Sequence, residues 1–461
     1  MNVADSDRMS SLLRRGGGTE VDRVEDADVI LINTCSVREK PEVKVYSRLG
    51  ELRKLKRSNP GLVLGVCGCQ AQREGENILR NAPFVDLVVG TANVEQVAEL
   101  VDRVRRTGER VVALEMPERG SPSWMSPEPH MTTDLVELLP DASGVDARLK
   151  AFVPIILGCD FACTYCIVPT TRGPERSRPV GQVLGEIRAL AQSGVKEVML
   201  LGQTVDAYRA HYNADEVAGS RTFDLADLIR LIEDVDGIER VRFTSPHPML
   251  MNDHLISAIA ECPKACEWIH LPLQSGSDAV LKRMARRYNR SRYLDRIQRI
   301  REEMPGCAIT TDLIVGFPGE TEDQFQETLD FVRDIRFDGA YMFAYSPRPG
   351  TPAFGWETEV PREITVERLN RLIQLQNRIS LEKNQEQVGG TVEVLVEGPS
   401  DHGEGLWTGY TRENKTCHFT GRPGLRGRVV ELVTTRAAQW GFFAEPVGGT
   451  AQMVSLPVLN T

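Results

Sequence analysis

The chain has 461 residues, of which 41% are hydrophobic and 26% charged, with a formal net charge of −10; this composition is typical of a globular protein of about three domains. No apolar run approaches the ~18 residues of a membrane helix, the polar and acidic start excludes a secretory signal, and the net acidity argues against non-specific polyanion binding by the whole chain. Six of the ten cysteines fall in two regions, which favours metal ligands in a reducing compartment, the cytoplasm, over a disulfide framework.

Residues 1–114 alternate predicted strands with predicted helices. The expected elements are strands at 28–32, 61–66, 84–89 and 110–114 and helices at 38–55 and 94–107. This alternation predicts a parallel sheet covered by helices, and ligands bind such sheets at the carboxyl ends of the strands. Cys35 and Cys69 lie in two of these strand-to-helix loops, so we expect them to share a metal site. Buried packing is the favoured interpretation of Cys67.

A central domain at residues 147–386 follows a proline-rich linker at 115–146. Its expected strands are 151–157, 197–201, 240–243, 268–271, 308–315 and 340–343. Helical patterns lie between these strands, and six strand–helix units are typical of a parallel barrel. Functional residues of such barrels collect at the carboxyl ends of the strands. A long amphipathic helix at 361–387 is expected at the end of this domain.

Short strands separated by Gly and Pro turns are expected in residues 387–446, as in a small antiparallel barrel. They are predicted at 391–396, 405–410, 415–419 and 427–434. The module binds RNA or serves as a stabilising appendage. The tail at 447–461 carries no strong pattern and is expected to be disordered.

A basic run spans residues 282–301 of this acidic chain. It holds nine lysines and arginines against a single acid, Asp295. The run predicts either a local phosphate-contacting surface or a solvated helix face. On the first interpretation Arg283, Arg286 and Arg287 are the expected RNA contacts.

Three cysteines with the spacing CxxxCxxC follow the first strand of the central domain, at Cys159, Cys163 and Cys166. Three thiolates at this spacing can bind three irons of a cubane 4Fe–4S cluster. No fourth cysteine follows within reach, so one iron would stay open for a substrate or cofactor. Zinc is the main alternative, but structural zinc usually takes four ligands in CxxC pairs, and neither a second pair nor a nearby histidine is present.

This spacing, with Tyr165 before the third cysteine, resembles the radical S-adenosylmethionine (SAM) enzymes. Among the methylthiotransferases, the stretches 33–40, 200–208 and 284–288 resemble the tRNA-2-methylthio-N(6)-dimethylallyladenosine synthases more than their relatives. Further motifs carry the resemblance to the methylthiotransferases as a whole. These motifs are Ile167-Val168-Pro169, Arg172-Gly173, Ser177-Arg178-Pro179, Leu200-Leu201-Gly202-Gln203, Ser245-Pro246-His247-Pro248, the stretch 270–277 (HLPLQSGS) and the stretch 312–320 (DLIVGFPGE). The resemblance covers the chain to about residue 446.

The resemblance implies a partial (β/α)6 barrel, a C-terminal RNA-binding TRAM domain, SAM and two 4Fe–4S clusters. The cluster on the three central cysteines would bind the amino and carboxylate groups of SAM and cleave SAM to a 5′-deoxyadenosyl radical. Candidate residues for the SAM pocket are Tyr165, Gly202, Gln203, Ser245, Gln274 and Asp312. The implied reaction is methylthiolation of carbon 2 of N(6)-dimethylallyladenosine next to the anticodon of tRNA. An electron donor such as flavodoxin or ferredoxin and a monomeric state are also expected.

The second, auxiliary cluster of this family sits on three N-terminal cysteines, of which Cys35 and Cys69 match the second and third. The first belongs to a Gly-Cys-Gln-Met-Asn stretch after an opening strand, and this chain begins at Met1-Asn2. We therefore expect the first strand and first ligand to be missing through a misplaced start. Cys67 lies two residues from Cys69 and would share its side of an extended segment, which makes it an alternative third ligand.

Three alternatives to the dimethylallyladenosine reaction stay open. The stretch Gln203-Thr204-Val205-Asp206 departs from the usual Gln-Asn-Val-Asn, which leaves substrate detail undecided. The same chemistry could act on threonylcarbamoyladenosine in tRNA or on an aspartate of a ribosomal protein. A chain without the first auxiliary ligand could instead be a non-catalytic RNA-binding iron–sulfur protein.

Overall fold

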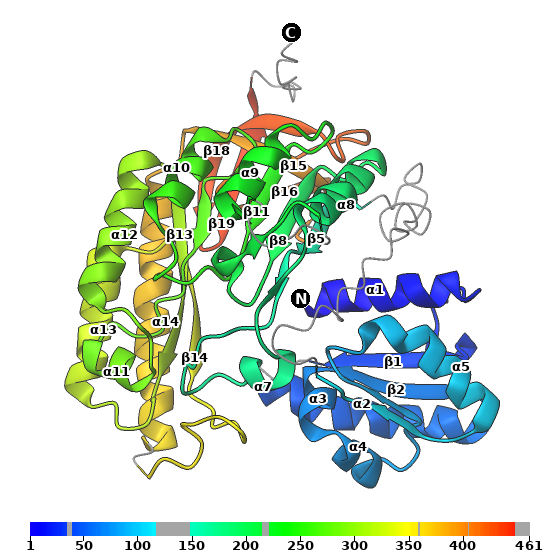
Figure 1. Cartoon of the computed structure of the whole chain (residues 1–461). Coiled ribbons are helices and arrows are strands. Elements are labelled where there is room, and N and C mark those ends of the chain that lie inside the picture. Colours follow the sequence, from blue (N-terminus) through cyan, green and yellow to red (C-terminus); the bar gives the residue numbers. More distant parts are fainter. Residues whose placement is uncertain (35–38, 117–147, 214–220, 358–359, 404, 448–461) are drawn as a thin grey trace.

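The computed structural model describes residues 1–34, 39–116, 148–213, 221–357, 360–403 and 405–447 (Figure 1). An N-terminal sheet domain, a partial barrel and a small closed β-barrel follow one another along the chain. Cys35, nearly all of the predicted linker and the predicted tail lie outside the described residues. None of the described helices is long and apolar enough to cross a membrane.

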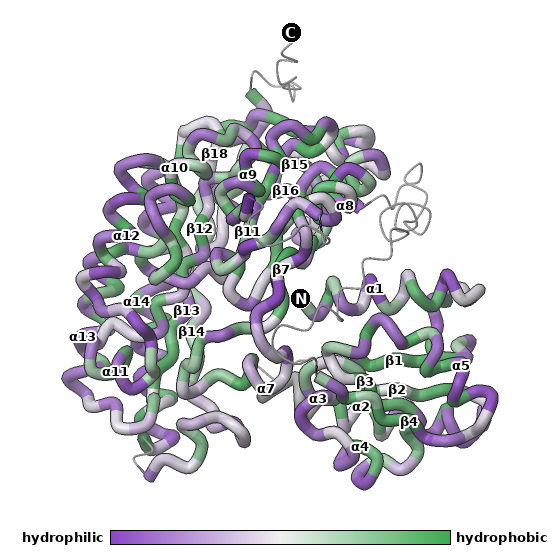
Figure 2. Tube along the Cα trace, viewed as in Figure 1, coloured by the Kyte–Doolittle hydropathy of each residue, from purple (hydrophilic) through white to green (hydrophobic). Residues whose placement is uncertain are grey.

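The N-terminal domain contains a four-stranded parallel sheet in the order β1-β2-β3-β4. Its elements are α1 (Asn2–Arg15), β1 (Val29–Thr34), α2 (Glu39–Ser58), β2 (Val63–Gly68), α3 (Cys69–Glu74), α4 (Glu76–Asn81), β3 (Leu87–Val89), α5 (Val97–Thr107) and β4 (Val111–Ala113). β2 and β3 are buried throughout, and Figure 2 shows them as hydrophobic. Strands buried on both faces need such continuous apolar runs, so the predicted parallel sheet is confirmed.

Helix α1 had no sequence prediction, because its sequence is mostly polar and only Ala4 and Met9 are buried. Met9 packs into the apolar core that Val63, Cys67 and Leu87 contribute to from the sheet. Arg8 of α1 pairs with Glu95, which lies just before α5. One buried methionine and ion pairs therefore hold the helix, and neither produces a helical hydrophobic pattern.

The central domain is a partial barrel of six parallel strands in two halves, β11-β8-β5 and β12-β13-β14, and the predicted fold is confirmed. The strands and helices are β5 (Lys150–Pro154), β6 (Ile156–Leu157), α7 (Val168–Arg172), β7 (Arg176–Ser177), α8 (Val180–Gln192), β8 (Glu197–Leu201), β9 (Arg209–Ala210), β10 (Phe223–Asp224), α9 (Leu225–Glu233), β11 (Arg240–Phe243), α10 (Asp253–Glu261), β12 (Trp268–His270), α11 (Asp278–Arg283), α12 (Arg290–Glu303), β13 (Ala308–Val315), α13 (Glu322–Ile335) and β14 (Gly339–Ala344). Capping boxes at Asp224 and Thr321 start α9 and α13.

Helix α14 (Arg362–Gln385) leads into a closed five-stranded barrel with the order β15-β16-β17-β19-β18. Its strands are β15 (Thr391–Pro399), β16 (Leu406–Thr411), β17 (Thr416–Thr420), β18 (Val429–Ala438) and β19 (Gly441–Pro446). Four of the five strands match the sequence prediction, and β19 was missed. The barrel packs on the amino ends of the central strands, where Arg242 of β11 donates to the carbonyls of Thr411 and Arg412 at 2.8 and 2.6 Å.

Candidate functional site

The three central cysteines lie in one loop between β6 and α7, at the end of the barrel opposite the small β-barrel. The loop begins at Gly158, which has φ +80° and would place any Cβ on the carbonyl group of Pro174. Gln203 fixes this start, because its Oε1 accepts the Gly158 N–H at 2.6 Å. Only glycine suits this position, and the predicted residue Gln203 holds the loop.

The sulfur atoms of this loop face hydrogen-bond donors. The backbone N–H of Phe161 donates to Cys159 Sγ at 3.4 Å, and Thr204 Oγ1 lies 3.1 Å from the same sulfur. Arg286 Nη1 donates to Cys163 Sγ at 3.4 Å. Donors around the sulfurs are a feature of iron–sulfur sites, where they help to set the reduction potential.

Burial raises the pKa of the Cys159 thiol and raises that of Cys166 to about 12. Buried thiols stay protonated without a metal, and metal binding must release these protons. The three sulfurs do not all lie within 4.8 Å of one another. A tetrahedral zinc ion with Zn–S bonds of about 2.3 Å would hold its sulfurs about 3.8 Å apart. The donor set therefore fits a cluster with several irons better than a single zinc ion.

Two predicted SAM-pocket residues have clear packing roles. Gly202 lies against Ile156 and Val205, where a Cβ would overlap both residues. The Tyr165 ring meets Phe317 edge-on, with ring centroids 6.4 Å apart, in a small apolar cluster. Both residues shape the cysteine loop and its wall.

Of the other three predicted SAM-pocket residues, Ser245 and Gln274 follow β11 and β12, and Asp312 lies within β13. Ser245 and Gln274 have left-handed backbones, with φ +65° and +74°. The Gln274 N–H donates to the carbonyl of Asp312 at 2.8 Å, which joins two of the predicted residues. Asp312 Oδ1 lies 3.4 Å from Nε2 of the buried His270, and its side chain is 30% exposed. Two strained non-glycine residues on one side of a barrel are typical of a functional site.

His247 was quoted only as part of a motif, yet the structure stacks it on the cysteine loop. Its ring lies 4.0 Å from that of Phe161 with an interplanar angle of 13°. Nδ1 accepts from the Met249 N–H at 3.2 Å, and both Asp206 carboxylate oxygens accept from the His247 N–H at 2.9 Å. Burial lowers the pKa of His247 to about 2, so the ring is neutral. The Ser245-Pro246-His247-Pro248 motif was the sequence signal that could have identified His247 as a site residue.

The basic run at 282–301 does not form one surface. Arg286 is buried against Cys163, so the prediction that it contacts RNA is wrong. Arg283 donates to Gln324 Oε1 at 2.8 Å and is partly buried. Arg287 is exposed, with its guanidinium 5.6 Å from the centre of the Phe161 ring. On α12, Arg296 pairs with Asp253 at 2.6 Å. Charge counting did not reveal these different environments.

The N-terminal cysteines occupy different environments. Cys67 is fully buried in the sheet core, and burial raises its pKa to about 12, as its packing interpretation predicts. β2 ends at Gly68, and Cys69 begins α3, so these two cysteines do not share one side of an extended segment. Gly68 pairs with Thr34, the residue before Cys35, and has φ +90°. Cys69 therefore leaves the sheet at the same edge as the chain that leads to Cys35.

Helix α7 connects the two cysteine regions, because it begins two residues after Cys166 and packs against α3 (Figure 1). Its last residue, Arg172, is 5% exposed and pairs with Asp5 at 2.6 Å. Burial alone lowers the pKa of Arg172, but Asp5 and the nearby Cys69 raise it above the ordinary value. A buried guanidinium from the domain that carries the other three cysteines thus lies near Cys69.

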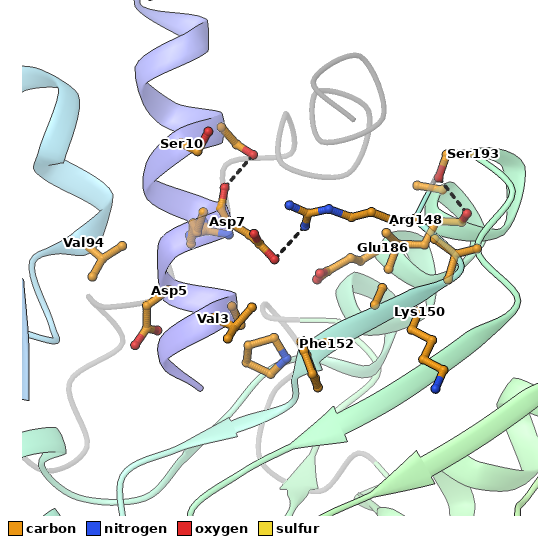
Figure 3. A pocket seen from close by; sticks show the side chains of 18 of the residues that line it. Val3, Asp5, Asp7, Ser10, Val94, Arg148, Lys150, Phe152, Glu186 and Ser193 are labelled. Atoms are coloured by element: carbon orange, nitrogen blue, oxygen red, sulfur yellow. Dashed lines mark hydrogen bonds and ion pairs between the residues drawn. The ribbon is translucent and has the colours of Figure 1, made fainter. Parts of the chain in front are cut away.

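A cavity of about 690 Å³ lies between α1 and the barrel, beside β5 and α8 (Figure 3). Charged side chains from both domains line it, and Asp7 pairs with Arg148 across it at 2.7 Å. The predicted cluster ligands and SAM-pocket residues do not contribute to its described lining. Leu157, which directly precedes the cysteine loop, is among the lining residues, so the cavity reaches the start of that loop.

Three family models match the chain, each over one of its parts. They are the "Uncharacterized protein family UPF0004" at residues 1–90, the Radical SAM superfamily at 153–332 and the TRAM domain at 385–447. The chain is similar in fold to the radical SAM methyltransferase TsrM from Kitasatospora setae, with a TM-score of 0.53 and 14% identity, over 88% of this chain and 74% of that one. The partial barrel and its three-cysteine loop are those of a radical SAM enzyme.

Closer relatives are tRNA-2-methylthio-N(6)-dimethylallyladenosine synthases. The protein of this name from Symbiobacterium thermophilum is 46% identical over 450 residues, which cover 97% of this chain and 92% of the relative. That from Bacillus subtilis is 42% identical over 97% of this chain and 84% of the relative. The chain belongs to the tRNA-2-methylthio-N(6)-dimethylallyladenosine synthase family.

Proposed function

We propose that this enzyme transfers a methylthio group to carbon 2 of N(6)-dimethylallyladenosine next to the anticodon of tRNA, with SAM as methyl donor and radical source. The observation that carries the proposal is the loop of Cys159, Cys163 and Cys166, after which the next cysteine in the sequence is Cys262. Family membership over nearly the whole chain supports the substrate.

The proposed ligands of the radical SAM cluster are these three cysteines. When bound, a 4Fe–4S cluster with one open iron supplies the electron that cleaves SAM. The protein holds the loop through Gly158 and Gln203 and surrounds it with Phe161 and the neutral ring of His247. A neutral imidazole beside the loop can bind a cationic sulfonium compound without repelling it.

The SAM pocket is proposed to include Tyr165, Gly202, Gln203, Ser245, Gln274 and Asp312. Gln203 orients the cysteine loop, and the carboxylate of Asp312 is accessible to a ligand. Cys69 is proposed as a ligand of the auxiliary cluster together with Cys35, with the guanidinium of Arg172 nearby. A reduced flavodoxin or ferredoxin is the proposed electron donor, the cytoplasm the location, and a monomer the working form.

Nucleoside analysis of tRNA tests the substrate. Iron–sulfur-reconstituted protein is incubated with SAM, a reductant and tRNA that carries either dimethylallyladenosine or threonylcarbamoyladenosine. We expect the 2-methylthio product only from the first tRNA, and loss of that product from tRNA of a deletion strain. Product from the second tRNA alone would replace the proposed substrate. Cluster formation without SAM cleavage would favour a non-catalytic RNA-binding protein.

A further inference from the structure

Arg286 is a buried cation whose hydrogen bonds reach sulfur and oxygen atoms of neutral groups. It is 8% exposed, and its Nη1 donates to Cys163 Sγ at 3.4 Å. Nη2 donates to the carbonyl of Pro272 at 3.3 Å, and Nε to Tyr288 Oη at 3.1 Å. The described residues place no carboxylate within ion-pairing distance of it. Because an unpaired buried charge is costly, an anion at Cys163 is the partner that this arrangement requires.

The backbone around Arg286 is joined to the cysteine loop. Thr164, next to Cys163, donates its N–H to the carbonyl of Met284 at 3.1 Å and its hydroxyl to that of Arg283 at 2.9 Å. Ala285 has φ +55°, a left-handed conformation that is strained for alanine. The chain accepts this strain immediately before Arg286, and two hydrogen bonds keep the segment in place beside the loop.

The charge on this guanidinium is permanent. Arginine stays protonated in proteins, so burial beside Cys163 does not remove the charge of Arg286. A fixed positive charge near a cluster stabilises the reduced form, which carries one more negative charge than the oxidised form. The electron comes from the external reductant, and Arg286 neither gains nor loses a proton.

We propose that Arg286 is a positioning residue that sets a permanent positive charge beside Cys163 and thereby raises the reduction potential of the cluster at that loop. The inference rests on the proposed function, because it assumes that Cys159, Cys163 and Cys166 hold the cluster. It also assigns a different role to an arginine of the basic run. The neighbouring Arg287 is exposed and serves as the matched control.

The test compares Arg286→Met, Arg286→Lys and Arg287→Met in the reconstituted full chain. Iron content is measured first, and the reduction potential is then titrated by electron paramagnetic resonance. We expect Arg286→Met to lower the equilibrium constant for one-electron reduction about tenfold, which is about 59 mV. Arg286→Lys and Arg287→Met should keep the potential of the unchanged protein, because each retains the charge at position 286.

Each result decides the inference. An unchanged potential in Arg286→Met with full iron content would overturn it. If Arg286→Met loses the cluster, Arg286→Lys decides: a retained cluster with the original potential supports a role for charge. Loss of the cluster in the lysine variant, or a lowered potential there, would show that guanidinium geometry alone matters. Unchanged protein that takes up no iron would instead defeat the proposed function.

Discussion

The two cysteine regions share one local design and differ in how the chain assembles them. A glycine with positive φ precedes a cysteine in both, Gly158 before Cys159 and Gly68 before Cys69. A buried arginine also lies near a cysteine in each: Arg286 donates to Cys163, and Arg172 lies near Cys69.

The two regions differ in how far apart their cysteines lie in the sequence and in whether the nearby arginine has a counter-ion. The central loop gathers three thiols within eight residues, whereas the N-terminal region depends on the ends of separate strands. Arg172 has Asp5 as a counter-ion, whereas the described residues around Arg286 offer it only neutral partners beside Cys163. A site within one loop is thus set by local sequence, but the other depends on the packing of the whole domain.

Removing the central thiols should have the largest effect. The triple variant Cys159→Ala, Cys163→Ala and Cys166→Ala is expected to lose SAM cleavage completely, because the cluster then has no protein ligands. The measurement is 5′-deoxyadenosine formed with dithionite. Cys262→Ala, which changes a buried cysteine of the barrel core, should retain the activity. Cleavage by the triple variant would refute the assignment of the radical SAM site.

Substitutions at the N-terminal site should affect product formation but not SAM cleavage. Cys69→Ala should abolish the methylthio nucleoside while SAM cleavage persists, because the radical SAM ligands all lie in the other loop. Cys67→Ala should keep the product and lower the free energy of unfolding by about 1 kcal/mol through its small cavity. Product chromatography and urea denaturation check the pair. If Cys67→Ala lost the product while remaining folded, Cys67 would be the ligand.

The counter-charge of Arg172 should matter more than a similar pair nearby. Asp5→Ala leaves Arg172 buried without its carboxylate and should destabilise the protein by about 3 kcal/mol. Asp7→Ala removes a pair with the half-exposed Arg148 and should cost less than about 1 kcal/mol. Urea denaturation of the two variants makes the comparison, and equal losses would contradict a special role for the buried pair.

Near the central loop, Asp206 should make stability depend on pH. Burial raises the pKa of this carboxyl from 3.8 to about 8. Between these values the folded protein holds a proton that the unfolded chain has released, so stability falls as pH rises. The fall is at most about 1.4 kcal/mol per pH unit, and Asp206→Asn should reduce it. An identical pH profile for Asp206→Asn would show that the carboxyl is already ionised in the folded state.

The smallest effect is expected on tRNA binding. Arg287→Ala removes an exposed charge and should lower the slope of log affinity against log salt concentration by about 1. Arg296→Ala, which changes an arginine already paired with Asp253, should alter the slope less. Filter binding at several salt concentrations measures both. Equal slopes in Arg287→Ala and the unchanged protein would leave only the solvated-face interpretation of that residue.

The strands of the central barrel could be predicted because short segments with β-branched and aromatic residues lie between helical patterns, and β8, β11 and β13 begin and end where expected. The three-cysteine loop could be predicted equally well, since its ligands are close in sequence. The buried position of Arg286 could not be predicted, because a basic run gives no sign that one of its arginines turns inward after the strained Ala285. Helix α1 depends on partners such as Glu95 and Arg172, which no local pattern reveals.

The contact between the small β-barrel and the central barrel has a consequence for truncation experiments. Arg240 and Arg242 are almost fully buried at the amino ends of the strands, and carbonyl groups of Tyr410, Thr411 and Arg412 accept their hydrogen bonds. Cutting away the small barrel would leave both guanidinium groups without these acceptors. A shortened protein that lost activity would then report a damaged catalytic domain, so the RNA-binding role of the small barrel is better measured with surface substitutions in the intact chain.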